Sequence, residues 1–419
     1  MIKKISVIVI TMFLASLFSF NVDASLVLDY KKELELNDYT QSNISNINKG
    51  SLTSDRITLN LPIRNKSDYS LSKIDLVSPH FTYSKEVRGI YINGWVVSNE
   101  RKIDNLIKEV EESNLNSIVV DLKDVTGRIT FSKNQNDISN LFGNGLKELI
   151  DKAHKKGIYV IGRLAVFKDP VFAKKNSKYA LKYISAIDNE TVINSNLWTS
   201  PYSKEVWKHN ITIAEQAVKL GLDEIQFDYI RFPTLAVNSE LIIRLEENRS
   251  RTDAIEGFLK FANERLGKYN ILISADVFGL TTTAKGDLKI GQDITRLVDY
   301  VDYLSPMIYP SHYSAGFYGI DNPDSNPYDI IFESLEDARE KLGDKSYKLR
   351  PWLQDFSLRH IYTDKEVKEQ IKAVKDNQIS SWLLWNPRSV YTISAVKDES
   401  KKGMEERWNL QGSELFQKK

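Results

Sequence analysis

The sequence contains no cysteine, and only five histidines occur among its 419 residues. The absence of cysteine excludes disulfide bonds, thiol catalysis and metal sites ligated by cysteine. No histidines stand in an H-x-x-x-H or H-E-x-x-H arrangement, which argues against a zinc site built from histidines. We therefore expect no bound metal and no other cofactor.

An excess of charge of one sign is also missing, because 57 Lys and Arg residues balance 56 Asp and Glu residues. This balance gives no sign of a nucleic-acid partner. No G-x-x-x-x-G-K-[ST] motif occurs, and the G-x-G at 143–145 is more typical of a loop before a helix than of a phosphate site. We expect neither nucleic acid nor a nucleotide as a partner.

The N-terminus has the pattern of a targeting segment. Lys3 and Lys4 precede an apolar stretch at 5–20, and residues 22–24 have the small-residue spacing of a cleavage site. The stretch is short for a spanning helix, so we expect residues 1–24 to be a cleaved signal peptide, with a retained anchor as the alternative. The protein would then be secreted or associated with the cell envelope, with no membrane span after cleavage.

Residues 86–405 alternate between strand-like and helix-like segments. The polar residues 25–85 before them are interpreted as a linker or small N-terminal extension, and 406–419 as a C-terminal tail. Strands are expected at 89–95, 117–124, 158–166, around 225, and at 271–276, 300–308, 348–353 and 380–385. Helices are expected at 99–113, 146–156, 205–220, 253–266, 293–298, 328–342 and 364–375.

Alternation of this kind predicts parallel strands joined by crossover helices. Eight such units close naturally into a (β/α)8 TIM barrel, which here would carry the polar N-terminal extension. The alternative is an open doubly wound sheet. The barrel is favoured, partly because no glycine-rich phosphate loop follows the first expected strand.

The sequence 223–234, D-E-I-Q-F-D-Y-I-R-F-P-T, contains the most informative strand. Side chains alternate along a strand, so Gln226 and Asp228 share the face opposite Phe227. Asp228 would therefore lie at the C-terminal end of the fourth strand, where barrel enzymes keep their active sites. Arg231 follows three residues later. The alternative interpretation is a structural role for Asp228, which would cap a turn or form an ion pair with Arg231.

Polar or aromatic side chains also follow the other expected strands. They are Asp121, Lys123, Arg163, Asp276, Tyr309, His312, Gln354, Asp355, Trp385 and Asn386. In a barrel these side chains would converge at one end. Carboxylates at the ends of four strands, next to apolar runs, are difficult to explain as solvated charge, because burying an unpaired charge is costly.

Such a set suits glycoside hydrolysis, which needs one carboxylic acid to protonate the leaving oxygen and one carboxylate to attack the anomeric carbon or activate water. Asp228 is the candidate nucleophile, Asp276 the candidate acid with a raised pKa, and Asp355 the reserve acid/base. Structural roles stay open for Asp276 as a cap, and for Asp355 and Asp121. The other expected site residues would bind substrate: Asp121, Lys123, Arg163, Gln226, Arg231, Tyr309, His312, Gln354, Trp385 and Asn386. Of the cations, Arg231, Lys123 or Arg163 would keep Asp228 ionised, and His312 is more easily interpreted as a wall residue than as a base.

The chain resembles the glycoside hydrolase domain family of bacterial exported proteins, long catalogued as a domain of unknown function. The matching motifs are G-I-Y-I-N-G-W at 89–95, V-V-D-L-K-D-V-T-G-R-I-T-F at 119–131, G-R-L-A-V-F-K-D-P at 162–170, S-P-Y-S-K-E-V-W at 200–207, D-E-I-Q-F-D-Y-I-R-F-P at 223–233, A-D-V-F-G at 275–279, V-D-Y-L-S-P-M-I-Y-P-S-H-Y at 301–313, R-P-W-L-Q-D-F at 350–356 and W-L-L-W-N-P at 382–387. They cover about residues 86–405 in order.

This resemblance implies a (β/α)8 barrel related to retaining α-glycosidases, whose nucleophile is an Asp at the end of the fourth strand, here Asp228. In the larger amylase-like group the acid on the fifth strand is usually Glu, whereas this chain has Asp276. That departure leaves the identity of the proton donor open.

Three functions remain to be distinguished. The first is a secreted glycoside hydrolase acting on a cell-envelope or extracellular polysaccharide. The second is a non-catalytic carbohydrate-binding barrel, which aromatics such as Trp198, Trp207, Trp352 and Trp385 would also serve. The third, a polysaccharide deacetylase or other metal hydrolase, would need a His/Asp cluster that the scattered histidines do not suggest. Carboxylate pairs all separated by well over about 10 Å would favour binding alone.

The long segment 168–200 follows the third expected strand. Trp198, and Tyr202 and Trp207 just after the segment, would either line a substrate subsite or pack against the barrel without contacting a ligand.

Overall fold

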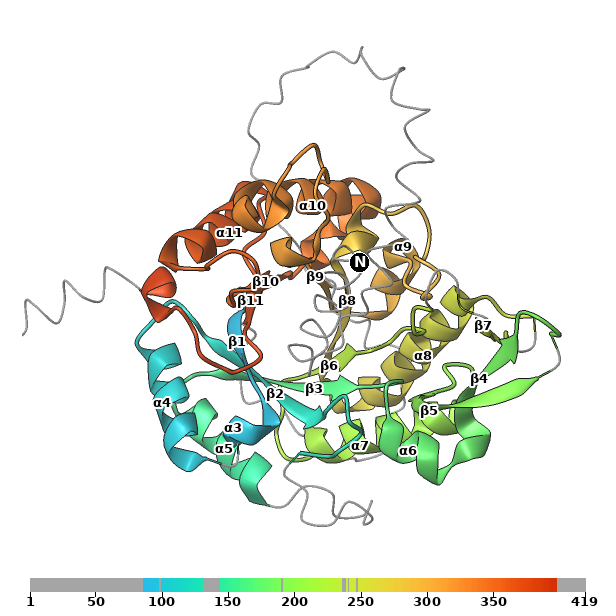
Figure 1. Ribbon diagram of the computed structural model, residues 1–419. Helices are drawn as coiled ribbons and strands as arrows, with labels where there is room; N and C mark the ends of the chain where they lie inside the picture. The colour runs from blue at the N-terminus through green and yellow to red at the C-terminus, as the bar shows by residue number, and fades with distance from the viewer. Residues whose placement is uncertain are drawn as a thin grey trace, which may run out of the picture.

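A computed structural model of the chain describes residues 86–397, except 98, 131–143, 190, 236–238, 240 and 246–247. In this part eight parallel strands close into a barrel in the order β1-β11-β10-β9-β8-β6-β3-β2, with helices around it (Figure 1). The predicted (β/α)8 fold is thereby confirmed. The predicted signal peptide, the extension at 25–85 and the tail at 406–419 lie outside the described residues. None of the helices in the described ranges combines the length and apolarity needed to cross a bilayer.

The barrel strands follow the chain order expected from the sequence. They are β1 (Arg88–Ile92), β2 (Ser117–Lys123), β3 (Tyr159–Ala165), β6 (Glu224–Asp228), β8 (Leu272–Phe278), β9 (Tyr303–Met307), β10 (Trp352–Gln354) and β11 (Trp382–Trp385). The helices are α3 (Gly94–Val97), α4 (Glu100–Glu111), α5 (Asn144–Lys155), α6 (Pro170–Lys175), α7 (Lys204–Val218), α8 (Arg251–Leu266), α9 (Ile294–Leu297), α10 (Pro327–Leu342) and α11 (Asp364–Asp376).

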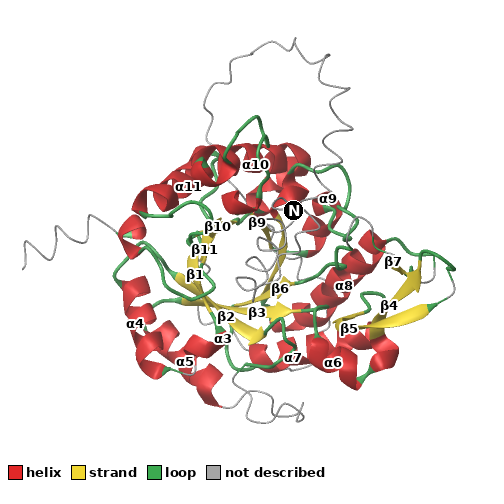
Figure 2. Cartoon of the chain, in the orientation of Figure 1, coloured by secondary structure: helices red, strands yellow, loops and turns green. Residues whose placement is uncertain are grey.

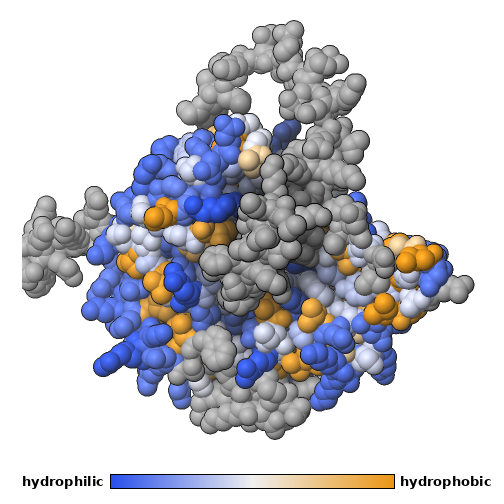
Figure 3. Space-filling model, viewed as in Figure 1, coloured by the Kyte–Doolittle hydropathy of each residue, from blue (hydrophilic) through white to orange (hydrophobic). Residues whose placement is uncertain are grey.

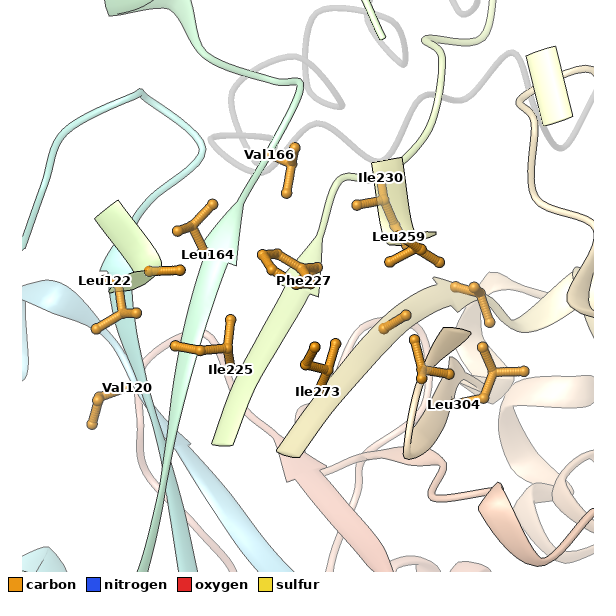
Figure 4. Packing of buried hydrophobic residues seen from close by; sticks show 14 of the residues in the cluster. Val120, Leu122, Leu164, Val166, Ile225, Phe227, Ile230, Leu259, Ile273 and Leu304 are labelled. Carbon is orange, nitrogen blue, oxygen red and sulfur yellow. The ribbon is translucent and has the colours of Figure 1, made fainter. Parts of the chain in front are cut away.

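The main core lies between the outer faces of the barrel strands and the helices. Ile225 and Phe227 of β6 belong to this core, together with Leu164 of β3 and Leu259 of α8 (Figure 4). The Phe227 ring meets the Phe258 ring edge-on at a centroid distance of 5.1 Å. Because Ile225 and Phe227 face the helices, alternation directs Gln226 and Asp228 into the barrel, as expected from the sequence.

The first strand is shorter than expected. It ends at Ile92, not at residue 95, because a short helix, α3, begins at Gly94. The side chain of Asn93 accepts a hydrogen bond from the backbone N–H of Val96 at 2.9 Å, which caps that helix.

A three-stranded antiparallel sheet was not anticipated. Its order is β5-β4-β7, with β4 (Ala180–Ser185), β5 (Val192–Thr199) and β7 (Leu241–Ile243). The sheet projects beside the barrel in Figure 2. The sequence indicated only a long polar and aromatic segment at 168–200. Strand β7 comes from the chain after β6, and local pattern gives no information about a pairing over that separation.

The barrel interior contains a fully buried ion pair at its N-terminal end. Nη1 of Arg350 donates to Oε2 of Glu224 at 2.9 Å, Nη2 donates to Oε1, and both side chains are 0 % exposed. Tyr159 also donates to Oε2 of Glu224 at 3.1 Å. Burial lowers the pKa of Arg350, but the charge of Glu224 and its hydrogen bond raise it, and the net shift is upward. The Arg350 guanidinium therefore keeps its charge although it is desolvated.

Removing one member of this pair should be strongly destabilising. We expect Arg350→Met to lower the free energy of unfolding by about 3–5 kcal/mol, because Glu224 is left buried without its cation. The double variant Glu224→Leu/Arg350→Met should regain most of that loss. Urea denaturation followed by circular dichroism measures both effects.

The matched control is Lys147→Met, which breaks an exposed ion pair with Asp151 on α5. It should change the free energy of unfolding by about 1 kcal/mol or less. An Arg350→Met variant as stable as this control would contradict the prediction.

Candidate active site

Four charged side chains meet at the C-terminal ends of four neighbouring barrel strands. Asp121 comes from β2, Arg163 from β3, Asp228 from β6 and Asp276 from β8, in the order in which these strands pair. Their exposed fractions are 2 %, 4 %, 4 % and 1 %. We refer to these four residues as the carboxylate cluster.

Arg163 joins the members of the carboxylate cluster. Its Nε donates to Oδ2 of Asp228 at 3.0 Å, its Nη2 donates to the same oxygen, and its Nη1 donates to Oδ1 of Asp121 at 2.5 Å. Oδ2 of Asp276 lies 4.0 Å from Nε. The Oδ2 atoms of Asp228 and Asp276 are therefore at most 7.0 Å apart, the sum of the 3.0 and 4.0 Å distances to Nε. This bound is well inside the ~10 Å limit for a catalytic pair.

The environment favours the protonated form of two of these carboxyl groups. Burial raises the pKa of Asp276 well above its usual range and the charge of Asp228 raises it further, while Arg163 and a hydrogen bond from Trp352 lower it. Burial also raises the pKa of Asp121, against the opposing effects of Arg163 and of a hydrogen bond from Tyr91. The cluster thus combines a carboxylate paired with a guanidinium, Asp228, and a neighbouring carboxyl group suited to carry a proton, Asp276.

The backbone after Asp228 is strained. Tyr229 has φ 52°, in the left-handed region that bulky residues rarely adopt. The loop after β3 stabilises this geometry, because Val166 N–H donates to the Asp228 carbonyl at 2.8 Å and Phe167 N–H donates to the Tyr229 carbonyl at 3.2 Å. Tyr229 N–H donates to Oδ1 of Asp228 at 2.5 Å. The Asp228 side chain is thus fixed by its own neighbours as well as by Arg163.

Aromatic side chains surround the cluster. Tyr91 of β1 stacks on Trp385 of β11 at a centroid distance of 4.1 Å, and the guanidinium of Arg163 lies 5.2 Å from the Trp385 ring. Tyr91 donates to Oδ2 of Asp121 at 2.5 Å, and Trp352 Nε1 donates to Oδ1 of Asp276 at 2.8 Å. Burial and the charges of Asp276 and Asp228 raise the pKa of Tyr309, so this phenol lies within the electrostatic influence of the same carboxylates.

The structure brings together Asp121, Arg163, Asp228, Asp276, Tyr309 and Trp385, six of the residues expected from the sequence. Tyr91 was missed. Its only signal in the sequence was the alternation of β1, where an aromatic residue with a polar tip lies between the buried Ile90 and Ile92.

Lys123 lies outside the cluster. Its Nζ donates to Oδ2 of Asp169 at 2.6 Å and to Oδ1 of Asn210 on α7 at 2.7 Å. A register shift in β2 between Asp121 and Lys123 breaks the simple alternation that placed the two residues on one face. Lys123 therefore anchors the loop after β3 from the helix side and does not neutralise Asp228.

The carboxylate of Asp355 has Thr392 as its partner, and among the described residues it forms no ion pair with Arg163. Its two carboxylate oxygens accept hydrogen bonds from the backbone N–H and the hydroxyl of Thr392, at 2.8 and 2.7 Å. Burial raises the pKa of Asp355, while the hydrogen bonds from Thr392 lower it. Asn386 donates to the Asp355 carbonyl, and Gln354 accepts from the Ser311 N–H at 3.1 Å. These side chains hold the loops after β9, β10 and β11 together.

Two further expected residues lie near the cluster, Gln226 buried and His312 partly exposed. Gln226 is 0 % exposed and donates to the Ser305 hydroxyl at 3.4 Å, one layer below Asp228 in the barrel. Burial and the nearby Arg359 lower the pKa of His312 to about 4, so this imidazole is neutral at neutral pH. It lies 5.4 Å from the Tyr309 ring. The interpretation of His312 as a wall residue stays a prediction.

Arg231 has aromatic neighbours and forms no ion pair with Asp228 among those found in the described ranges. Its guanidinium lies 4.5 Å from the Phe278 ring and 4.9 Å from the Trp198 ring. Tyr202 and Trp207 are buried, and each hydrogen bonds to a backbone carbonyl. These two aromatics pack, whereas Trp198 lies beside Arg231 near the strand end. No group of three His, Cys, Asp or Glu side chains in the described ranges is placed to hold a metal ion.

Comparisons with known proteins identify the family and the fold. The model of a family described as "Putative glycosyl hydrolase domain" matches residues 89–391. The glycoside hydrolase domain of PgaB (BpsB) from Bordetella bronchiseptica is similar, with 12% identity, a TM-score of 0.54, and coverage of 73% of this chain and 95% of that chain. The C-terminal domain of a "putative chitinase" from Desulfitobacterium hafniense is also similar, with 12% identity, a TM-score of 0.50, and coverage of 74% of this chain and 97% of that chain. At this identity the likeness shows a shared fold.

A hypothetical protein from Ruminiclostridium thermocellum is 31% identical over 45% of this chain and 97% of its own, with a TM-score of 0.38. None of the curated proteins matches the chain.

Replacing Arg163 should make stability more dependent on pH. We expect Arg163→Met to lower the free energy of unfolding by about 3–5 kcal/mol at neutral pH, because buried carboxylates lose their cation. Arg163 lowers the pKa values of Asp121 and Asp276, so without it both rise further above those of the unfolded chain. As the pH increases, these two carboxyl groups then lose their protons at lower pH in the unfolded chain than in the folded one, which lowers the free energy of unfolding. The stability that Arg163→Met loses relative to the parent protein should therefore be smaller at acidic pH than at neutral pH.

Urea denaturation at both pH values tests this sign. Arg101→Met, which removes an exposed cation on α4, is the control and should cost little at either pH. An equal loss for Arg163→Met at the two pH values would contradict the proposed role of the guanidinium.

Proposed function

The chain belongs to the family described as "Putative glycosyl hydrolase domain", and on this premise we propose that it is a secreted glycoside hydrolase acting on a cell-envelope or extracellular polysaccharide. The observation that carries the proposal is the carboxylate cluster. Asp228 and Asp276 lie within 7.0 Å of each other through Arg163, at the end of the barrel where barrel enzymes keep their active sites. Export rests on the targeting pattern of residues 1–24.

In this mechanism Asp276 is the general acid and Asp228 the nucleophile. Asp276 transfers its proton to the glycosidic oxygen as the bond to the leaving sugar breaks, and Asp228 forms a bond to the anomeric carbon. Asp276, now ionised, takes a proton from water, which attacks the same carbon and releases Asp228. The bound on their separation is compatible with the ~5–5.5 Å of retaining enzymes.

The other members of the site act on these two carboxyl groups or on the sugar. Arg163 holds Asp228 with two N–H donors, which fixes the direction of attack. Trp352 fixes Asp276 through Oδ1. Tyr91, Trp385 and Tyr309 provide flat rings beside the carboxylates, and such rings suit the apolar faces of sugars.

Substitution of either carboxylate should abolish turnover. We expect Asp228→Asn and Asp276→Asn each to lower kcat/KM by a factor of about 10²–10⁴ or more, since each removes a group that acts in the transition state. The measurement is a hydrolysis screen of the purified protein against bacterial envelope glycans and aryl α- and β-glycosides. Asp344→Asn, an exposed carboxylate before β10, is the matched control and should keep full activity.

Asp355→Asn separates the two candidate acids. Its carboxylate contacts Thr392, so the variant should keep turnover within a few-fold of the parent if it folds. Glycan binding without turnover in the parent protein, retained in both Asp228→Asn and Asp276→Asn, would replace the hydrolase by a carbohydrate-binding barrel.

The pH dependence of activity should report on Asp276. The hydrogen bond from Trp352 lowers the pKa of Asp276, so Trp352→Phe should raise it further. A general acid must be protonated to act, and the alkaline decline of kcat/KM should therefore move to higher pH. Trp382→Phe is the control, because the Nε1 of this buried residue has no hydrogen-bond partner in the described ranges. An alkaline limb that moves to lower pH in Trp352→Phe would rule out Asp276 as the acid.

A further inference from the structure

The antiparallel sheet β5-β4-β7 presents two parallel rows of side chains on its outer face. The strand register places residue 184 opposite 192 and 242, and residue 182 opposite 194, while the Arg244 N–H donates to the Lys182 carbonyl at 2.9 Å. Opposing residues share a face of an antiparallel sheet. One row is therefore apolar and the next is polar and cationic: Ile242, Ile184 and Val192, then Arg244, Lys182 and Asn194.

The apolar side chains of this sheet are unusually exposed. Seven of the eleven exposed large hydrophobic residues in the described ranges belong to α6, to this sheet or to its connections: Val171 47 %, Ile187 77 %, Val192 47 %, Ile193 43 %, Leu197 48 %, Ile242 44 % and Leu245 50 %. Figure 3 shows hydrophobic surface gathered at the outer end of the sheet. Single exposed apolar residues are ordinary on a protein surface, but a contiguous group indicates a contact with something else.

The cations on the same face are placed unfavourably for the isolated protein. Arg244 and Lys182 lie directly opposite each other on β7 and β4, and like charges at such a position destabilise a sheet. In the described ranges, no acidic side chain forms an ion pair with either of them. Lys174 and Lys178, just before β4, are exposed as well. An anionic surface laid against this face would relieve the repulsion.

We propose that the β5-β4-β7 sheet docks on an anionic phospholipid bilayer. The aliphatic row and the tip residue Ile187 would enter the boundary of the acyl region, and Lys182 and Arg244 would meet the headgroup phosphates beside it. Aliphatic side chains fit this partner better than a polysaccharide, whose sugar faces pair with aromatic rings. This interaction is independent of catalysis.

Docking would also orient the barrel. The sheet is formed by the chain that follows β3 and the chain that follows β6, so it branches from the same end of the barrel as the carboxylate cluster. A sheet bound to the bilayer keeps that end close to the membrane surface.

Cosedimentation with lipid vesicles tests the proposal. The chain from residue 25 onward keeps every described residue and lacks the apolar stretch 5–20, which would bind lipid by itself. We expect it to bind vesicles that contain phosphatidylcholine and phosphatidylglycerol, and to bind them more weakly at high salt. Vesicles of pure phosphatidylcholine should bind little of the protein. Lys182→Gln/Arg244→Gln should weaken the partition coefficient about 25-fold, at about fivefold for each cation. Ile187→Ser/Val192→Ser should weaken it about tenfold or more.

Matched controls lie elsewhere on the barrel. Arg101→Gln/Lys375→Gln removes the same charge from α4 and α11, and Tyr347→Ser removes an exposed apolar side chain at the N-terminal end of the strands. These variants should bind like the parent, and thermal unfolding checks that all of them fold. The proposal is overturned by the absence of binding, by equal binding to neutral vesicles, or by sheet variants that match the controls. A dimer in light scattering that is lost in Ile187→Ser/Val192→Ser without lipid would assign the face to a second copy of the chain instead.

Discussion

Arg163 places one positive charge among three buried carboxyl groups, and the arrangement of the site depends on the hydrogen bonds of this guanidinium. Asp121 and Asp228 each receive N–H donors from it, and Asp276 lies at the edge of its reach. One cation cannot neutralise three carboxylates in a desolvated site, so at least one carboxyl group is driven toward its protonated form. The shortage of positive charge makes it unfavourable for all three carboxyl groups to be ionised. For the same reason it provides a protonated carboxyl group beside a carboxylate.

The barrel interior has a charged network at each end and, between them, apolar side chains together with the Gln226–Ser305 hydrogen bond. Glu224 and Arg350 close the N-terminal end, and the carboxylate cluster occupies the C-terminal end. Val119, Ile161 and Leu383 fill the space between the two networks. The Glu224–Arg350 pair matches one acid with one cation, whereas the carboxylate cluster contains three acids and one cation, and we propose that this excess of acid serves the chemistry. The hydrophobic layer keeps both networks dry, which makes their interactions strong and their partial removal costly.

The C-terminal end of the barrel also carries the chain's additional structure. The loop after β3 holds the strained Tyr229 and then continues into the β5-β4-β7 sheet. Lys123 and Asp169 fasten the start of this loop from the helix layer. The position of Asp228 and the position of the exposed sheet are therefore set by one segment of the chain, which links the site to the surface proposed to meet the membrane.

The sequence by itself determined the eight-strand barrel and the strand ends from which Asp121, Arg163, Asp228 and Asp276 project, because hydrophobic periodicity and strand alternation are local properties. Only the tertiary structure decided which charges are partners. A register shift in β2 places Lys123 against α7. The carboxylate of Asp355 accepts hydrogen bonds from Thr392. The ion-pair partner of Asp228 is Arg163 and not Arg231. The tertiary structure also paired β7 with β4 across the chain that contains β6. Hydrogen-bond partners and long-range strand pairs depend on where distant segments meet, and that information is absent from any local pattern.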